Sequence, residues 1–424
     1  MSLPARGGQF SITIVRLAVD LVLHAGATIR GVASCLSLMV SRLGLDFPAP
    51  SFGAVRSWLL RIGCYALCRP LPRDTPWFWL MDHTIQIGSQ KLLVIAGCPL
   101  ADVPFGERPL RISDLTLLAL VPMDHSTGKL VDVEMEKVVI RTGVPRVIVS
   151  DEGSDLNNGV ALFQQRHPQT VHVHDAAHQA ANVLKNRWEK DERWLAFVQR
   201  LPQVAAKLRQ TKEAYLLPPA LRTKARFMNV GPLLRFAERV LGLLDKPSPS
   251  PKVVEKYGWL GEYRGALAEW RCEYEIAQTV IQHVRLHGVN RESVATLEAD
   301  WSKLGEATAL PGARDVMARM RSFVRKEGEL ANPCERLPGS TEVLESAFGK
   351  LKRLEQSQSG GGFTGLVLTL GTMMSDTEEE DIREGLDAVP KKEAEGKVKR
   401  MFGATMQWLR RRFMNGEECV PNPG

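Results

Sequence analysis

The chain has 424 residues, too long for one ordinary hydrophobic core, and its 44% hydrophobic content excludes a disordered protein. It carries 55 Lys and Arg against 48 Asp and Glu, and this excess of positive charge suits a polyanionic partner. Seven scattered cysteines without a Cys-x-x-Cys pair indicate neither a disulfide framework nor a cysteine-rich zinc module.

Apolar stretches near the N-terminus are interrupted by Arg16, Asp20 and Arg30. We therefore expect no membrane partner, no membrane-spanning segment and no signal peptide. The cysteine pattern fits a reducing compartment, so a cytoplasmic location is predicted.

The N-terminal region predicts two short helices. Residues 28–43 carry apolar side chains at helical spacing, and Gly44 follows them as a C-cap. After the proline-containing linker 45–50, Ser51 can cap a second helix with its own apolar face. A tight connection between two short helices is expected.

The second of these helices carries Arg56 and Arg61. Such a pair of helices is typical of a helix-turn-helix whose second helix enters the major groove of DNA. An ordinary helical hairpin is the alternative, but eight Arg against three Asp before Pro76 favour DNA. We interpret residues 1–74 as a helical helix-turn-helix region that binds DNA through Arg56 and Arg61.

The pattern changes to strands after Pro76. Residues 77–87 and 90–98 predict a hairpin with Gly88 and Ser89 at its turn, and a third strand is predicted over 115–121.

A helix over 128–142, a strand over 146–150, a helix over 160–165 and a strand over 171–174 follow. The order β-β-β-α-β-α-β predicts an α/β fold, with a mixed sheet and helices on both faces.

From about residue 179 to 330 the sequence is almost wholly helical, with a Pro-Ser-Pro-Ser-Pro linker at 247–251. A further helix runs through Glu345 to Leu354, with Ser340 or Thr341 as its N-cap. We therefore expect an all-helical domain inserted between the last strand and the final core helix.

The end of the chain is charged, with an acidic patch at 378–381 and a basic stretch from 391 to 412. A solvated amphipathic tail is predicted, and transient DNA contact is the alternative.

Three acidic residues are the candidates for catalysis. Asp82 lies in the middle of an apolar strand, where a charge is costly unless it meets a cation. Asp151 follows a strand at its carboxyl end, where the active sites of open α/β sheets gather. Glu345 lies on a late helix that can cross the sheet and complete the group.

Nearby acids keep alternatives open. Glu152 and Asp155 compete with Asp151, and Glu342 competes with Glu345. Any one of these positions can also be a helix cap or a turn residue.

Three carboxylates at one edge of a sheet can hold two divalent metals, roughly 3.5 to 4 Å apart, for an in-line displacement at phosphorus. Hard oxygen ligands favour Mg²⁺ or Mn²⁺ over zinc. Two Mg²⁺ (or Mn²⁺) ions bound by Asp82, Asp151 and Glu345 are therefore expected.

The order of elements, with acids on the first strand, after the fourth strand and on the last helix, resembles the ribonuclease-H-like core of DDE transposases. Three segments carry the likeness: WLMDHTIQIG around Asp82, VIVSDEGSDLNNGV around Asp151 and LPGSTEVLESAFGKLKRL around Glu345. The last is similar to the hAT-type signature, in which a Ser-rich turn leads to the catalytic Glu and then a Phe.

Two further positions follow from this resemblance. Asp175 and His178 in HDAAHQAANVL are similar to the Cys-x-x-His motif of hAT-type enzymes, which implies that they organise the site and contact DNA. Lys352, seven residues after Glu345, matches the basic partner of the catalytic Glu in some bacterial DDE enzymes.

The resemblance implies a DNA transposase that cuts and transfers strands of a mobile element, with transposon ends and target DNA as its partners. It would act as a homodimer or larger assembly on DNA, associated with the nucleoid if bacterial. A metal-dependent nuclease on the same core and a domesticated, non-catalytic DNA-binding protein are the alternatives.

The predicted domain boundaries follow. The catalytic core would comprise residues 75–190 and 336–375, the helical insertion 191–335, and the charged helical tail 376–424.

Overall fold

The structure is a computed structural model that describes residues 2–87, 90–220, 227, 230–356, 363–375, 377–403 and 406–416. The chain divides into two compact units. The first unit comprises 1–104, 109–172 and 341–424, and the second comprises 105–108 and 173–340.

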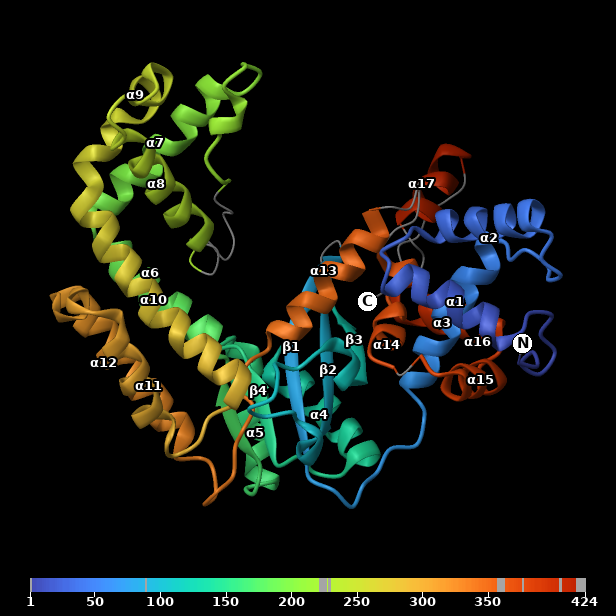
Figure 1. Ribbon diagram of the computed structural model, residues 1–424. Helices are drawn as coiled ribbons and strands as arrows, with labels where there is room; N and C mark the ends of the chain where they lie inside the picture. The colour runs from blue at the N-terminus through green and yellow to red at the C-terminus, as the bar shows by residue number, and fades with distance from the viewer. Residues whose placement is uncertain are drawn as a thin grey trace. The chain divides into compact units, whose positions relative to one another are not determined.

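A five-stranded mixed sheet has the order β3-β2-β1-β4-β5 (Figure 1). Its strands are β1 (Trp77–Ile87), β2 (Gln90–Pro99), β3 (Thr116–Met123), β4 (Val147–Ser150) and β5 (Val171–His174). β2 pairs antiparallel with both β1 and β3, whereas β1 pairs parallel with β4. The predicted strands and the α/β class are confirmed, and the predicted turn at Gly88 and Ser89 lies outside the described residues.

Alternating side chains fill the two faces of this sheet. Trp79, Met81 and Ile148 form a core with α4 (Gly128–Thr142) and α5 (Ser154–Arg166). The side chains of opposite parity, such as Leu80 and Val149, are buried as well. The sheet is therefore apolar on both sides up to the carboxyl end of β4.

Helices at both ends of the chain build the rest of the first unit. They are α1 (Ile12–Leu23), α2 (Ile29–Leu43), α3 (Phe52–Ala66), α13 (Glu342–Gln356), α14 (Thr369–Met373), α15 (Glu379–Ala388), α16 (Lys391–Phe402) and α17 (Met406–Met414). Thr28 and Ser51 cap α2 and α3, and Gly44 ends α2 with a φ of 61°, so the two predicted N-terminal helices are confirmed.

α3 lies at the centre of this helical group, in contact with α1, α2, α14, α15 and α16. The segment from Glu378 to Phe402 is therefore not the solvated tail that its charges predict. Ile382, Leu386 and Val389 of this segment are buried, because an apolar stripe lies between its charged residues.

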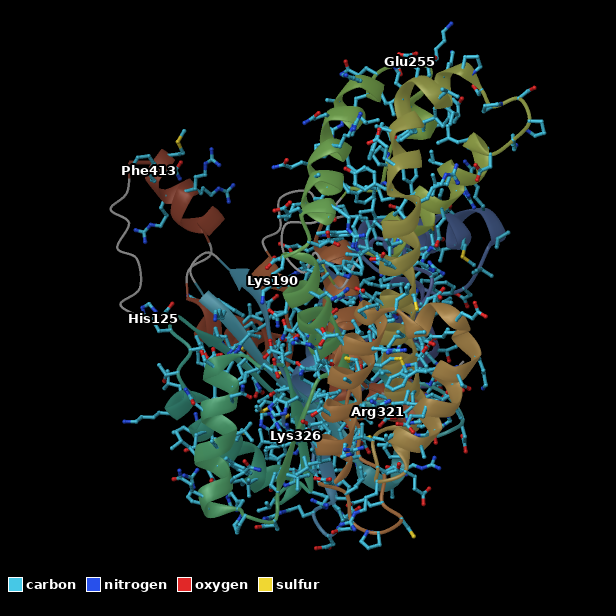
Figure 2. The ribbon with its side chains drawn as sticks, turned by 90° about the vertical axis from the view of Figure 1, so that its left-hand side faces the viewer. His125, Lys190, Glu255, Arg321, Lys326 and Phe413 are labelled. Atoms are coloured by element: carbon cyan, nitrogen blue, oxygen red, sulfur yellow. The ribbon has the colours of Figure 1, made fainter. Side chains whose placement is uncertain are left out.

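The second unit is helical, and no named strand lies within its described residues after β5. Its helices are α6 (Ala176–Trp188), α7 (Glu192–Leu208), α8 (Gly231–Leu244), α9 (Pro251–Tyr257), α10 (Arg264–His287), α11 (Ser293–Trp301) and α12 (Pro311–Gly328). The central helix α10 contacts α6, α8, α11 and α12. In Figure 2, Arg321 and Lys326 lie on α12, and Glu255 on α9 lies at the opposite end of the unit.

Buried tryptophans hold one part of the second unit together. The ring centroids of Trp188 and Trp194 are 4.5 Å apart, and those of Trp194 and Trp270 are 5.0 Å apart. Glu273 accepts hydrogen bonds from Trp188 and Arg187, each at 2.6 Å, which ties α6 to α10.

Short 3-10 turns complete the described structure: η1 (Leu100–Asp102), η2 (Ile112–Asp114), η3 (Ala214–Leu216), η5 (Gly258–Tyr263), η6 (Ser302–Leu304), η7 (Glu306–Ala309) and η8 (Phe363–Leu366). None of the helices in the described part of the chain has the length and apolar character needed to span a membrane.

Candidate functional site

Asp82 and Asp151 occupy equivalent positions on neighbouring parallel strands. Met81 of β1 is the register partner of Ser150 of β4, and each aspartate is the next residue along its strand. Neighbouring strands lie about 4.8 Å apart. Both aspartates are half-buried, so their carboxylates lie at one edge of the sheet, within reach of solvent.

The chain turns away from the sheet at Asp151. Its Oδ1 accepts a hydrogen bond from the Gly153 backbone N–H at 3.0 Å, just before α5 begins. The turn stabilises one oxygen of this carboxylate and holds the side chain at the strand end.

Glu345 lies in the first turn of α13. The Thr341 carbonyl accepts from the Leu344 N–H at 2.8 Å, so the helix starts where the sequence predicts. Leu344, Ala347 and Leu351 are buried, whereas Glu345 is exposed. α13 contacts β1 and crosses beside it (Figure 1), which brings the helix carrying Glu345 to the strand carrying Asp82.

A closed ligand cage is not formed in this conformation. Within the described ranges, no group of three or more His, Cys, Asp and Glu side chains is placed to hold a metal ion. Asp82, Asp151 and Glu345 nevertheless lie on or directly after elements that contact one another: β1 pairs with β4, and α13 contacts β1. All three offer hard carboxylate oxygens, and such a donor set fits Mg²⁺ or Mn²⁺.

Asp155, the competitor of Asp151, is engaged on the α5 side of the sheet. Its Oδ2 lies 3.5 Å from Nδ1 of His83 and 3.8 Å from Nζ of Lys91. Burial raises the pKa of Asp155, but the Ser126 hydroxyl and the charges of His83 and Lys91 outweigh it and lower that pKa overall.

A polar cluster of His83, Lys91, Ser126 and Asp155, which was not predicted from the sequence, lies here. Nε2 of His83 lies 2.9 Å from Oγ of Ser126, and burial lowers the pKa of His83 despite the nearby Asp155 carboxylate. The sequence did carry one signal for this cluster. Side chains alternate between the two faces of a strand, so His83 shares the face of Met81, which packs against α4 and α5. Because Asp155 is engaged by His83 and Lys91, Asp151 remains our candidate for the metal-binding carboxylate.

Asp175 and His178 lie in the second unit, where Asp175 is the N-cap of α6. The Asp175 Oδ1 accepts from the His178 N–H at 2.7 Å and lies 3.0 Å from Nδ1 of His178. Asp175 is 1% exposed, so this pair stabilises the start of a helix and holds the imidazole in place.

Two strand histidines also have polar partners that the sequence did not predict. Nε2 of His172 lies 2.8 Å from Oγ of Ser150, the residue before Asp151. Nδ1 of His174 lies 3.1 Å from Oε1 of Glu327, which is 1% exposed on α12.

The predicted DNA-contacting arginines bind protein groups. Arg56 donates to the Gly365 carbonyl at 3.0 Å, and Arg61 donates to the carbonyls of Val389, at 2.6 Å, and Leu386. Their role in DNA binding stays a prediction, while their role in joining α3 to the C-terminal segment is a structural finding.

Lys352 is exposed on α13, seven residues after Glu345. Seven residues turn a helix by two revolutions less about 20°, so both side chains project from the same face.

No model of a known protein family matches this chain, and no curated protein matches its sequence. The features that bear on function are therefore Asp82 on β1, Asp151 directly after the parallel partner strand β4, and Glu345 on a helix that contacts β1.

Proposed function

We propose that the chain is a DDE-type DNA transposase with a ribonuclease-H-like core. The observation that supports the proposal is the parallel pairing of β1 with β4, after whose register pair Met81 and Ser150 come Asp82 and Asp151, together with the contact of α13, the helix that carries Glu345, with β1. The strand order β3-β2-β1-β4-β5, with a helical unit between β5 and α13, is compatible with this core.

Asp82, Asp151 and Glu345 would bind two Mg²⁺ ions. When bound, these ions supply charge stabilisation for the attacking and leaving oxygens of a phosphodiester. Asp82 lies on β1, Asp151 directly follows β4, and Glu345 lies on α13, which contacts β1. Lys352, on the same face of α13 as Glu345, is suited to a phosphate of the DNA strand.

The test is a Mg²⁺-dependent nicking and strand-transfer assay on the full chain with Asp82→Asn, Asp151→Asn and Glu345→Gln. Each variant is expected to lower the cleavage rate by about a thousandfold or more, because loss of one ligand disorders the metal pair. Mn²⁺ affinity, measured by calorimetry, is expected to fall in parallel. Retained cleavage in any variant would remove that residue from the site.

Matched variants decide among the competing acids. Asp155→Asn and Glu342→Gln remove carboxylates three or four residues away from Asp151 and Glu345. A larger loss of cleavage rate in Asp155→Asn than in Asp151→Asn, or in Glu342→Gln than in Glu345→Gln, would assign the ligand role to the competing residue. Asp102→Asn, on the exposed turn η1, is the control for removal of a carboxylate elsewhere in the first unit. DNA binding measured without metal should be nearly unchanged in all of them.

A metal-dependent nuclease is the second candidate, and the burial of α3 favours it. A nuclease needs no helix-turn-helix to hold transposon ends, and α3 is surrounded by five other helices. Strand transfer decides between the two: joining of a 3′ hydroxyl to target DNA supports a transposase, and hydrolysis alone supports a nuclease.

A further inference from the structure

Two adjoining hollows of about 260 and 330 Å³ lie in the first unit, where α1 ends against α13 and α14. They share Leu23, His24, Lys350 and Met373 in their linings, so we treat them as one groove, the α1–α13 groove. Each volume lies near the lower end of the range of small-molecule sites, which begins at about 300 Å³.

Two cations, Lys350 and Arg353, line this groove. Lys350 is half-buried and Arg353 is exposed, and both project from one side of α13, because they are three residues apart. Neither has an ion pair or hydrogen bond to any residue in the part of the chain that the structure describes. Two neighbouring cations at the lining of one groove attract an anion from outside the chain, because such an anion would reduce their mutual repulsion.

Further polar residues lie beside these cations. Ser113, Thr377 and His24 also line the groove, and Nε2 of His24 is 3.7 Å from Oδ1 of Asp20. The hydroxyls of Thr372 and Ser375 are not available, because they donate to backbone carbonyls.

The remaining lining is apolar. Val22, Leu23, Leu354 and Met373 contribute to it. An inorganic anion needs only the cations, whereas an apolar surface beside two cations matches a ligand that joins a phosphate to an organic ring.

The groove lies apart from the candidate metal ligands on α13. Relative to Glu345, Lys350 is rotated by about 140° and Arg353 by about 80° around the helix axis, while Lys352 shares the face of Glu345. A ligand in the groove would therefore approach α13 from another side than a metal at Glu345.

We propose that the α1–α13 groove binds a nucleotide through its phosphate group, with Lys350 and Arg353 as the principal ligands. Two sources supply this chemistry: a free mononucleotide, or a phosphate of a DNA strand. Only the second source rests on the proposed transposase function. Both cations would form charge-assisted hydrogen bonds with the phosphate oxygens.

The test measures binding of three probes to the full chain by calorimetry or anisotropy: dAMP, deoxyadenosine, and a short 5′-phosphorylated single-stranded oligonucleotide. Lys350→Gln and Arg353→Gln are each expected to weaken binding of dAMP or of the oligonucleotide about tenfold. Lys392→Gln removes the same charge from an exposed position on α16 outside the lining, and is expected to leave the affinity within about twofold.

The probes separate the sources. Binding of dAMP that depends on Lys350 indicates a free nucleotide, and binding of the oligonucleotide alone with the same dependence indicates a DNA strand. Equal affinities of the wild type and Lys350→Gln for both phosphorylated probes would overturn the proposal, as would equal affinity for deoxyadenosine and dAMP. If Lys350→Gln loses phosphate binding while the wild-type chain shows no Mg²⁺-dependent cleavage or strand transfer, the groove stands and the transposase proposal fails.

Discussion

His283 shows how burial of one side chain sets a pH dependence. It is 8% exposed on α10, its Nε2 has no hydrogen-bond partner among the residues that the structure describes, and its ring lies 5.2 Å from that of His287. Burial lowers the pKa of His283 to about 4, and the His287 charge adds to this while the Asp300 carboxylate opposes it. The imidazole is therefore neutral in the folded protein at neutral pH.

We predict that the free energy of unfolding falls as the pH decreases from about 6.5 toward 4. The folded-state pKa of His283 lies below its ordinary value of 6.5, so over this range the unfolded chain binds a proton that the folded chain does not. The stabilisation is complete above pH 6.5, and its loss amounts to at most about 3 kcal/mol. Urea unfolding followed by tryptophan fluorescence at several pH values measures it.

His283→Gln should flatten this pH dependence, because the amide does not titrate. His125→Gln, on the exposed loop before α4, serves as the control and should keep the wild-type slope (Figure 2). An unchanged slope in His283→Gln would assign the acid sensitivity to other groups.

Residues at the candidate site were predictable where a carboxylate follows an apolar strand, as for Asp82 and Asp151. The contacts of Arg56 and Arg61 were not, because their acceptors are backbone carbonyls roughly three hundred residues later in the chain. A carbonyl acceptor has no residue type and leaves no mark in the sequence.

At the scale of elements, α3 and α14 pack at a glycine-lined contact. A Cβ at Gly63 would lie 1.7 Å from the Leu368 carbonyl oxygen, and one at Gly371 would lie 2.4 Å from the Gly63 carbonyl oxygen. Thr372 Oγ1 also donates to the Leu59 carbonyl at 2.5 Å. The two helices approach this closely because both positions lack a side chain.

We predict that Gly63→Ala destabilises the protein by about 3 kcal/mol or more, because backbone atoms must move to admit the methyl group. Gly53→Ala is the matched control on the same helix, since its Cβ would meet only Ser51 Oγ at 3.7 Å. There the change should be neutral or stabilising by up to about 1 kcal/mol. Thermal unfolding of both variants measures the difference, and equal melting temperatures would contradict this account of the contact.

The elements themselves were largely predictable, since α2, β1 and α4 carry clear periodicity and caps. α5 is longer than predicted, because its first residues after Gly153 are polar and give no apolar signal. The contact between α3 and α14 was hidden, since a glycine is equally compatible with a turn and with a close helix crossing.

At the scale of the whole molecule, local charge in the sequence did not predict the charge of the folded units. The second unit holds 28 of the 55 Lys and Arg and 21 of the 48 Asp and Glu, which leaves 27 of each for the first unit. The basic N-terminus is thus neutralised within its own unit, for example by the pair of Arg16 with Glu378 at 2.7 Å. A polyanionic partner would find the excess positive charge on the second unit.

Ion pairs and buried apolar side chains both attach the C-terminal segment to the rest of the first unit. Exposed ion pairs such as Arg16 with Glu378 contribute about 0 to 1 kcal/mol each. Burial of Ile382, Leu386 and Val389 contributes more, at about 1.5 to 3 kcal/mol for each side chain. Apolar contacts therefore dominate the attachment of the C-terminal segment, and their sum is comparable to the stability of a whole domain.

We predict that removal of residues 377–424 unfolds the helical part of the first unit, whereas removal of 404–424 leaves it folded. The longer deletion exposes α3 and leaves the Arg61 guanidinium without its two carbonyl acceptors, whereas the shorter one removes α17, whose Phe413 and Met414 are already exposed. Circular dichroism and limited proteolysis of both truncated chains provide the measurement. If the protein lacking 377–424 stays folded, this segment is not required for the fold of the first unit. α3 would then be accessible to a DNA groove, as the sequence predicts.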